Sequence, residues 1–362
     1  MKSSRTLTAV AGLASVTMLL AACGTGSGGS GDGGAASGDG DAQTLTYASY
    51  GGTFEAGQVK AWQEPYSAEN PGITFANTSP SDTAMIKAQV ESGNVQWDLA
   101  DVNPFFAADY CDELVEPLDL PNVDTSQFDE ALVGECYFGS YQFALIISYN
   151  TDKWPDPASA PSTVADFFDT EKFPGQRGVV NDVTNGMLEY ALMADGVTPE
   201  ELYPLDVDRA LAKWDTVRDQ TTFAANNGAM LQLATGNQVD MMMLVSARTK
   251  ASLDEGAPFA PIWDQTMVTF HTLVVPKGAP NKEAAMDFIE FTLEPEQSAG
   301  FAEAAGVSPT NKEAVIELDE TATEVNAFDE EVNTGGVITT DAEWWGENVT
   351  DVADRFNTWL NG

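Results

Sequence analysis

The sequence contains a single histidine, His271, among 362 residues. Catalytic triads use histidine and zinc sites commonly use several, so the chain has little material for either kind of site. It also lacks a GxSxG turn around a nucleophilic serine and an HExxH zinc motif. No motif marks two of its carboxylates as a pair for glycoside hydrolysis. These absences indicate a protein that is not an enzyme and that uses no cofactor or metal.

Basic residues are also scarce, since 16 Lys and Arg stand against 56 Asp and Glu and give a net charge of −40. Nucleic-acid phosphates are bound by Lys and Arg, so this composition excludes nucleic acid as a partner. The acids are spread along the chain rather than clustered. This spread favours a solvated acidic surface over a site for a cationic ligand, although both would explain the charge.

Long apolar runs are absent except at the start, where Leu7–Ala22 has the length of a signal-peptide core and is short for a membrane span. The run ends in LAACG, which resembles the bacterial lipobox, whose cysteine is lipidated and begins the mature chain. The alternative is an ordinary cleavage site that precedes a cysteine. Residues 24–41 are nearly all Gly, Ser, Ala and Asp, a composition typical of a flexible tether. We therefore predict a signal peptide (1–22), and then a tether (23–43) lipidated at Cys23 that holds an exported protein at the outer face of the cell membrane.

Only three cysteines are present, and lipidation of Cys23 leaves Cys111 and Cys136. An even pair in an exported protein favours a disulfide. Such a bond would close a loop of about 25 residues and contribute about 3 kcal/mol of stability. Two separate buried thiols are the alternative.

After residue 41, short runs rich in β-branched and aromatic residues alternate with helical patterns, which is typical of α/β units. The length of the chain favours two lobes. Strands are predicted at 44–50, 73–79, 97–103, 137–150, 177–183, 239–247 and 267–276. Helices are predicted at 55–69, 83–93, 162–169, 185–195, 206–219, 228–236, 247–255, 281–293, 295–305 and in the aromatic-rich tail.

Ligands of open α/β sheets bind beyond the carboxyl ends of the strands. The residues at these ends are Tyr50 to Thr53, Asp101 to Asn103, Asn181–Asp182 and Val245–Ser246. Gly51–Gly52 would let the backbone approach a ligand or leave a helix N-terminus free for an anion. A tight turn without a ligand is equally compatible with the two glycines.

Several stretches, in this order, resemble the extracellular solute-binding proteins of ABC importers, most closely the spermidine/putrescine-type branch: "YASYGGTFEAGQVKAW", "AQVESGNVQWDLADV", "FFDTEKFPGQRGV", "LYPLDVDRA" and "LVVPKGAPNKEAAMDFI". The resemblance implies a periplasmic-binding-protein-like type II fold, in which two α/β lobes are joined by crossover strands and a ligand cleft lies between them. Lobe 1 would comprise 44–147 and 272–310, and lobe 2 would comprise 148–271. Residues 311–362 would form a C-terminal helical tail that packs across the lobes.

The resemblance also implies ligand contacts. Aromatic and small polar residues follow the first and third strands of polyamine-binding members, and this chain has Tyr50, Asn103 and Phe105 there. The acids that hold the amine in those relatives are mostly missing, since His271 replaces an aspartate and only Asp182 stands near the paired acids. The predicted ligand-binding residues are Tyr50, Gly52, Thr53, Asn103, Phe105, Asp182, Ser246, His271 and Trp345.

Each of these assignments has a structural alternative. Tyr50 and Phe105 would serve equally as core aromatics, and Asp182 as the cap of a following helix. Trp345 would serve to fix the tail to lobe 1, and His271 would be either a cleft contact or a buried core residue.

The resemblance implies a monomeric, lipid-anchored receptor. It would capture a small organic solute of the polyamine or amino-compound class and deliver it to an ABC permease and ATPase complex. Because the acids are missing, a zwitterionic or anionic small molecule bound by Arg248 and the Gly51–Gly52 amides is the alternative. A surface scaffold without a role in transport is a further alternative, and it would have no small ligand.

Overall fold

The computed structural model describes residues 42–362. The predicted signal peptide and the lipidation at Cys23 lie outside the described residues, as does the predicted tether up to residue 41. The first strand begins at Gln43, one residue inside the predicted tether. No helix in the described part is both long enough and apolar enough to cross a bilayer.

The strands form one continuous mixed sheet in the order β2-β1-β3-β9-β4-β7-β5-β6, with β10 added beside β9 and β8 beside β4. Neighbours among β1, β2 and β3 are parallel, as are those among β5, β6 and β7, whereas β9 is antiparallel to β3 and β4. The strands are β1 (Gln43–Ala48), β2 (Ile73–Thr78), β3 (Leu99–Val102), β4 (Gly139–Asn150), β5 (Arg177–Val180), β6 (Thr221–Ala224), β7 (Met241–Val245), β8 (Phe259–Pro261), β9 (Thr266–Val274) and β10 (Val337–Thr339).

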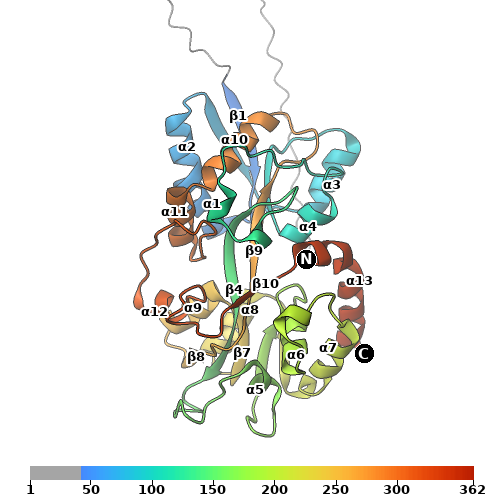
Figure 1. The fold of residues 1–362 in the computed structure, drawn as a ribbon, viewed down its shortest axis with the longest axis vertical. Coiled ribbons are helices and arrows are strands. Elements are labelled where there is room, and N and C mark those ends of the chain that lie inside the picture. Colours follow the sequence, from blue (N-terminus) through green and yellow to red (C-terminus); the bar gives the residue numbers. More distant parts are fainter. Residues whose placement is uncertain (1–41) are drawn as a thin grey trace, which may run out of the picture. The chain divides into compact units, whose positions relative to one another are not determined.

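Helices cover the strands of both parallel groups (Figure 1). They are α1 (Gly52–Gln58), α2 (Glu64–Glu69), α3 (Thr83–Ser92), α4 (Pro104–Asp109), α5 (Val164–Phe168), α6 (Met187–Ala194), α7 (Val207–Asp215), α8 (Asn227–Thr235), α9 (Ser246–Asp254), α10 (Lys282–Thr292), α11 (Pro295–Ala305), α12 (Glu320–Glu324) and α13 (Ala342–Asn361). A π-helical turn, η1 (Val59–Gln63), joins α1 to α2 within the predicted helix 55–69. Short 3-10 turns are η2 (Thr125–Gln127), η3 (Glu130–Leu132), η4 (Pro199–Glu201) and η5 (Arg218–Gln220).

The two parallel groups are joined by β4 and β9 (Figure 1). The first half of β4 pairs with β9, and from Leu145 onward β4 pairs with β7 of the other group. Every residue of β4 except Phe143 is buried, as expected for a strand that is covered on both faces. The arrangement is the predicted one, two α/β lobes joined by crossover strands.

The short elements β6, β8, β10 and α12 were not predicted. Each is only three to five residues long. A segment of this length carries too little periodicity to reveal its structure. The two short strands β8 and β10 are ordered by pairing with β4 and β9, and such pairing is invisible in the local sequence.

The C-terminal helix α13 contacts α4 of one lobe and α7 of the other (Figure 1). Asp341 caps its first turn by accepting a hydrogen bond from the Trp344 N–H. Farther along, the Arg355 guanidinium pairs with Asp208 at 2.6 Å. Helix α13 therefore packs against both lobes in addition to the crossover strands.

A disulfide joins Cys111, which follows α4, to Cys136, which precedes β4, with 5.4 Å between their Cα atoms. The pairing is the expected one. It fixes the loop between the third strand and the first crossover strand onto lobe 1.

A buried carboxyl fastens α13 to α6. The Glu189 side chain is fully buried, and its Oε1 accepts hydrogen bonds from the Tyr203 hydroxyl at 2.7 Å and from the Trp345 indole N–H at 2.9 Å. Within residues 42–362, its Oε2 has no hydrogen-bond partner. Burial raises the pKa of the Glu189 carboxyl above its usual value, although the two hydrogen bonds act in the opposite direction.

We predict that Glu189→Gln gains stability relative to the parent protein as pH rises from about 4 to about 8. A carboxyl whose pKa is raised by folding stabilises the fold below its unfolded pKa, and this contribution is lost as pH rises toward the folded pKa. Glutamine cannot ionise, so it avoids the loss. Urea unfolding across this pH range measures the difference, with the exposed Glu200→Gln as the control that should give a constant offset. A Glu189→Gln difference that does not change with pH would contradict the assignment.

Candidate functional site

A cavity of about 400 Å³ lies between the lobes. One wall comes from residues of β4, β9, α4 and the turn into α1, and the other from the loop after β5 and from the starts of α8 and α9. Among the predicted site residues, Tyr50, Asn103, Phe105, Asp182 and His271 all line it. The fold thus brings together five residues from distant parts of the sequence.

The lobe 1 wall is an aromatic box around His271. The imidazole centroid lies 5.2 Å from the Tyr50 ring, 5.2 Å from the Tyr141 ring and 5.7 Å from the Phe143 ring. The His271 side chain is 18% exposed, so it is mostly buried but still reaches the cavity. The box presents π faces and one imidazole edge to whatever enters.

A buried carboxylate lies behind this box. Asp101, at the end of β3, is fully buried, and its Oδ1 lies 3.1 Å from His271 Nδ1. Its Oδ2 accepts hydrogen bonds from the Gln58 side-chain amide at 2.7 Å and from the Tyr141 hydroxyl at 3.0 Å. Burial, together with the charge of Asp101, raises the pKa of Tyr141 well above its usual value, so this hydroxyl keeps its proton and donates it.

The lobe 2 wall contains Arg248, an exposed residue in the first turn of α9. The other arginines within residues 42–362 all bind a carboxylate or backbone carbonyl groups, whereas Arg248 does neither. Helix α9 also begins without a side-chain cap at Val245. A guanidinium and a helix N-terminus without a side-chain cap both favour a negatively charged group.

Polar residues complete the lobe 2 wall. The Asp182 carboxylate accepts hydrogen bonds from the Thr184 N–H at 3.1 Å and hydroxyl at 2.8 Å, and from the Asn185 amide at 3.0 Å. Helix α6 begins only at Met187, so Asp182 holds the turn before the helix rather than capping it. Asn227 adds a further amide to this wall.

Asn103 and Phe105 have structural contacts as well as cavity positions. Asn103 caps α4 by accepting a hydrogen bond from the Phe106 N–H at 2.9 Å. Phe105 is buried and packs against Trp345, with 5.7 Å between ring centroids. Both residues therefore form part of the wall and of its support.

The remaining predicted contacts do not belong to this cavity. Trp345 is fully buried behind Phe105, is bonded to Glu189 and does not line this cavity, so its contact with a ligand stays a prediction that this arrangement does not support. Ser246 lines a different cavity, and Gly52 opens α1 outside the lining residues. The side chain of Thr53 lies outside the described part of the chain.

The Gly51–Gly52 turn was an alternative anion site. Gly51 and Gly52 have φ angles of 76° and 61°, which glycine adopts easily, and they turn the chain from β1 into α1. The Gly51 N–H already donates to Ser49 Oγ at 3.1 Å. Neither glycine lines the cavity, so their amides do not contribute to it in this arrangement.

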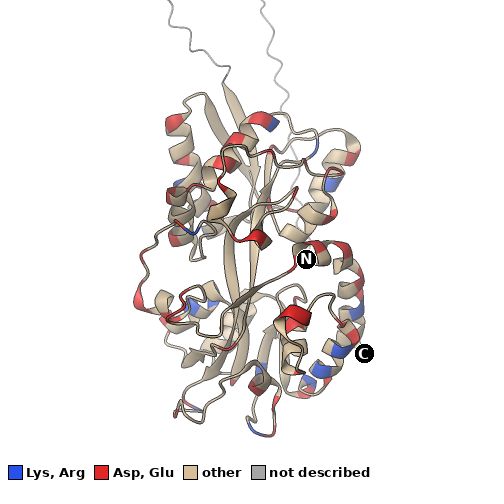
Figure 2. Ribbon diagram, viewed as in Figure 1, with Lys and Arg blue, Asp and Glu red and all other residues tan. Residues whose placement is uncertain are grey.

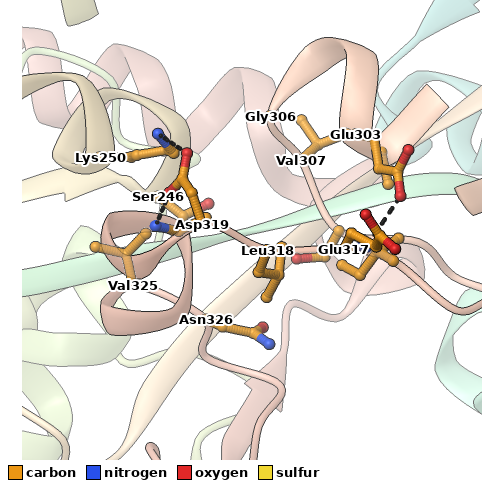
Figure 3. A pocket seen from close by; sticks show the side chains of 14 residues that line it. Ser246, Lys250, Glu303, Gly306, Val307, Glu317, Leu318, Asp319, Val325 and Asn326 are labelled. Atoms are coloured by element: carbon orange, nitrogen blue, oxygen red, sulfur yellow. Dashed lines mark hydrogen bonds and ion pairs between the residues drawn. The ribbon is translucent and has the colours of Figure 1, made fainter. Parts of the chain in front are cut away.

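Ser246 faces a second cavity of about 310 Å³ on another side of α9 (Figure 3). There Lys250 Nζ pairs with Asp254 at 2.8 Å and with Asp319 at 3.0 Å. The Glu317 N–H donates to Glu303 Oε1 at 2.9 Å. These contacts attach the chain between α11 and α12 to both lobes.

Several cavity residues were missed by the sequence analysis, notably Tyr141 and Phe143 on β4. Their spacing of two places them on one face of the strand, a signal that the sequence contained. Asp101 was noted only as a strand-end residue, and its contact with His271 depends on the pairing of β3 with β9. The part of the chain described by the structure contains no cluster of His, Cys, Asp and Glu arranged to hold a metal.

Comparison with known proteins identifies relatives across nearly the whole described chain. The sequence model of the family described as bacterial extracellular solute-binding protein matches residues 61–328. The gamma-aminobutyric acid-binding protein of Pseudomonas aeruginosa is 31% identical over 325 residues, which cover 88% of this chain and 91% of the relative.

Solved structures of solute-binding proteins are similar to this chain over nearly the same length. The Atu4243 GABA receptor is 32% identical with a TM-score of 0.79, over 88% of this chain and 98% of that one. AgtB from A. tumefaciens R10, solved with agropinic acid, is 32% identical with a TM-score of 0.70, over 88% and 99%. An ABC transporter substrate-binding protein from Bradyrhizobium japonicum is 31% identical with a TM-score of 0.77, over 87% and 99%. These similarities confirm the type II fold, while the spermidine/putrescine branch stays a prediction.

Proposed function

The chain belongs to the bacterial extracellular solute-binding proteins of ABC transporters, which are not enzymes, and on that premise we propose that its solute is a small zwitterionic amino compound. Such a solute has a carboxylate at one end and a primary ammonium at the other. The observation that carries the proposal is the contrast between the two walls of the cavity, with Arg248 on one lobe and the aromatic box on the other.

The carboxylate end is assigned to Arg248. In a chain with 56 acids, this arginine remains free of carboxylates within the described residues while it lines the cavity. A planar guanidinium binds a carboxylate through two parallel hydrogen bonds, and the dipole of α9 adds to the attraction. The carboxylate partner that Arg248 lacks within the described residues would be supplied by the solute.

The ammonium end is assigned to the aromatic box. The faces of Tyr50, Tyr141 and Phe143 attract a cation, and their carbon atoms can pack against its methylene groups. Asp101 places a negative charge directly behind His271. A diamine would put its second cation beside Arg248, so the cavity favours a zwitterion over a polyamine.

The position of the two ends suggests how binding closes the protein. A solute that contacts Arg248 on lobe 2 and the box on lobe 1 binds the closed arrangement more strongly than an open one. The names of two relatives report binding of GABA, a compound of this kind. A cavity of about 400 Å³ is large enough for a molecule of that size.

The predicted location is part of the proposal. The protein would be a monomer attached to the outer face of the membrane through Cys23, from which it hands its solute to an ABC permease and ATPase complex. The LAACG sequence and the Gly/Ser-rich stretch after it support this location.

We predict that GABA stabilises the protein more than any single-ended compound with the same four-carbon chain. Thermal unfolding would be followed with GABA, putrescine, n-butylamine and butyrate at equal concentrations, because the four compounds differ only in their ends. At equal concentration, the compound that binds more tightly raises the melting temperature more, roughly with the logarithm of its affinity. If putrescine stabilised the protein as much as GABA, a polyamine solute would be favoured, and if butyrate did so, an anionic solute would be favoured. If no compound stabilised the protein, a scaffold role would be favoured.

We predict that Arg248→Gln weakens binding of GABA by about 30- to 100-fold, the loss expected for a charged bidentate contact. The variant should also bind GABA and n-butylamine with similar affinity, because the carboxylate no longer has a partner. Titration calorimetry measures both. Lys60→Gln removes one charge from an exposed residue outside the cavity and should leave the affinity unchanged. An Arg248→Gln variant that still prefers GABA strongly would contradict the assignment.

We predict that Cys23→Ser prevents attachment to the membrane. Bacteria producing the full chain would be grown with an alkyne-tagged fatty acid, and the protein should carry the tag and sediment with membranes. Cys23→Ser should lose both properties, and Ser27→Ala in the same stretch should lose neither. A parent protein without the tag would contradict lipid anchoring.

A further inference from the structure

The buried carboxylate of Asp101 is the centre of a hydrogen-bond network behind the cavity. Its carboxylate contacts three side chains, namely Gln58, Tyr141 and His271. Gln58 and Tyr141 have N–H and O–H groups that point at Oδ2, and Tyr141 also lies 3.2 Å from Oδ1. The oxygen nearest to His271 is therefore left to accept a hydrogen bond from the imidazole.

The surroundings of His271 Nδ1 determine which nitrogen carries the proton. Nδ1 lies 3.1 Å from Asp101 Oδ1 and 3.0 Å from the Tyr141 hydroxyl oxygen. The carboxylate can only accept, and the tyrosine hydroxyl already donates its one proton to that carboxylate. Both neighbours of Nδ1 therefore act as acceptors, so Nδ1 must be the donor.

We infer that Asp101 holds His271 in the tautomer with its proton on Nδ1, so that Nε2 faces the cavity as a hydrogen-bond acceptor for a primary ammonium group. Asp101 is a positioning residue in this arrangement, because it acts on the solute through the imidazole. The inference rests on the proposed function and extends it by naming the group that the ammonium contacts.

The position of the second nitrogen supports this role. No hydrogen bond to His271 Nε2 occurs within the described residues, and the side chain lines the cavity. The rings of Tyr50, Tyr141 and Phe143 surround the imidazole and offer no acceptor other than hydroxyl oxygens and π faces. Nε2 is thus the strongest neutral acceptor in the box.

This arrangement has a consequence for selectivity. A cage of aromatic faces alone would bind a trimethylammonium group as well as a primary ammonium. An acceptor nitrogen requires an N–H donor, which a trimethylammonium group does not have. The site should therefore select primary amines and reject their trimethylated forms.

The first test needs no variant, because His271 is the only histidine in the chain. A long-range ¹H–¹⁵N NMR spectrum of labelled protein gives one imidazole pattern, and it should show the Nδ1–H tautomer. In the same protein, GABA should bind at least about 10-fold more tightly than its N-trimethyl derivative, which corresponds to loss of one charge-assisted hydrogen bond. A proton on Nε2, or equal affinity for the two compounds, would overturn the inference.

The second test is Asp101→Asn. The asparagine oxygen is drawn to the donors of Gln58 and Tyr141, so its NH₂ group turns toward Nδ1 and forces the proton onto Nε2. The NMR pattern should switch to the Nε2–H tautomer, and affinity for GABA should fall about 10- to 100-fold. Gln58→Met is the matched control, since it disturbs the same buried group but should leave the tautomer on Nδ1. A switched tautomer with unchanged affinity would overturn the role in recognition.

The two readouts separate this inference from the proposed function. An Nδ1–H tautomer in a protein that binds no GABA would refute the proposed solute but support the positioning by Asp101. Tight binding of GABA with an Nε2–H tautomer would support the proposed solute but refute the positioning by Asp101.

Discussion

The antiparallel ladder between β4 and β9 is the interaction on which the rest of the structure depends. It joins the two groups of parallel strands, and it also builds the lobe 1 wall of the cavity. Tyr141 pairs directly with His271, and Phe143 pairs with Thr269. Residues opposite each other in such a ladder have side chains on the same face. A shift of one residue in this register would turn the aromatic box away from the cavity, so the connection between the lobes and the recognition of a solute are fixed by the same hydrogen bonds.

Local patterns in the sequence located most of the elements, and strand-end positions found Tyr50, Asn103 and Asp182. They could place Tyr141 and Phe143 on one face of a strand but could not assign that face to the cavity, because this depends on which strand lies beside it. The sequence could not place Trp345 for a related reason, since a tail tryptophan can face the cavity or pack behind Phe105, and its buried hydrogen bond to Glu189 places it behind Phe105 here. Ser246 ends a strand as expected, but its side chain faces the second cavity. Sequence periodicity assigns a face to a residue, whereas tertiary packing decides what covers that face.

The charge of the protein gives the cavity its context. Acids are distributed over both lobes (Figure 2), and among residues 42–362 only a minority pair with a Lys or Arg. In such a chain a carboxylate partner for an arginine is easy to find, which makes the guanidinium of Arg248, unpaired among residues 42–362, informative. The buried carboxylate of Asp101 is the opposite case, an acid near the cavity that the sequence did not assign to the site. The sequence suggested that acids able to hold an ammonium were missing, but one lies a single side chain deeper, behind the histidine that replaced the expected aspartate.

The place of His271 on the crossover strand also has a mechanical consequence. His271 pairs with Tyr141, four residues before Leu145, where β4 begins to pair with β7, so in the proposed binding mode one end of the solute lies on the crossover strands that join the lobes. Arg248 lies on α9 of lobe 2 and would move with that lobe in a hinge motion about the crossover strands. A solute bound to both His271 and Arg248 would set the distance between the lobes, and each additional methylene group would hold the lobes farther apart. In this binding mode the angle between the lobes would depend on the length of the solute, and a permease that accepts only one angle would reject a solute that is too long even when it binds.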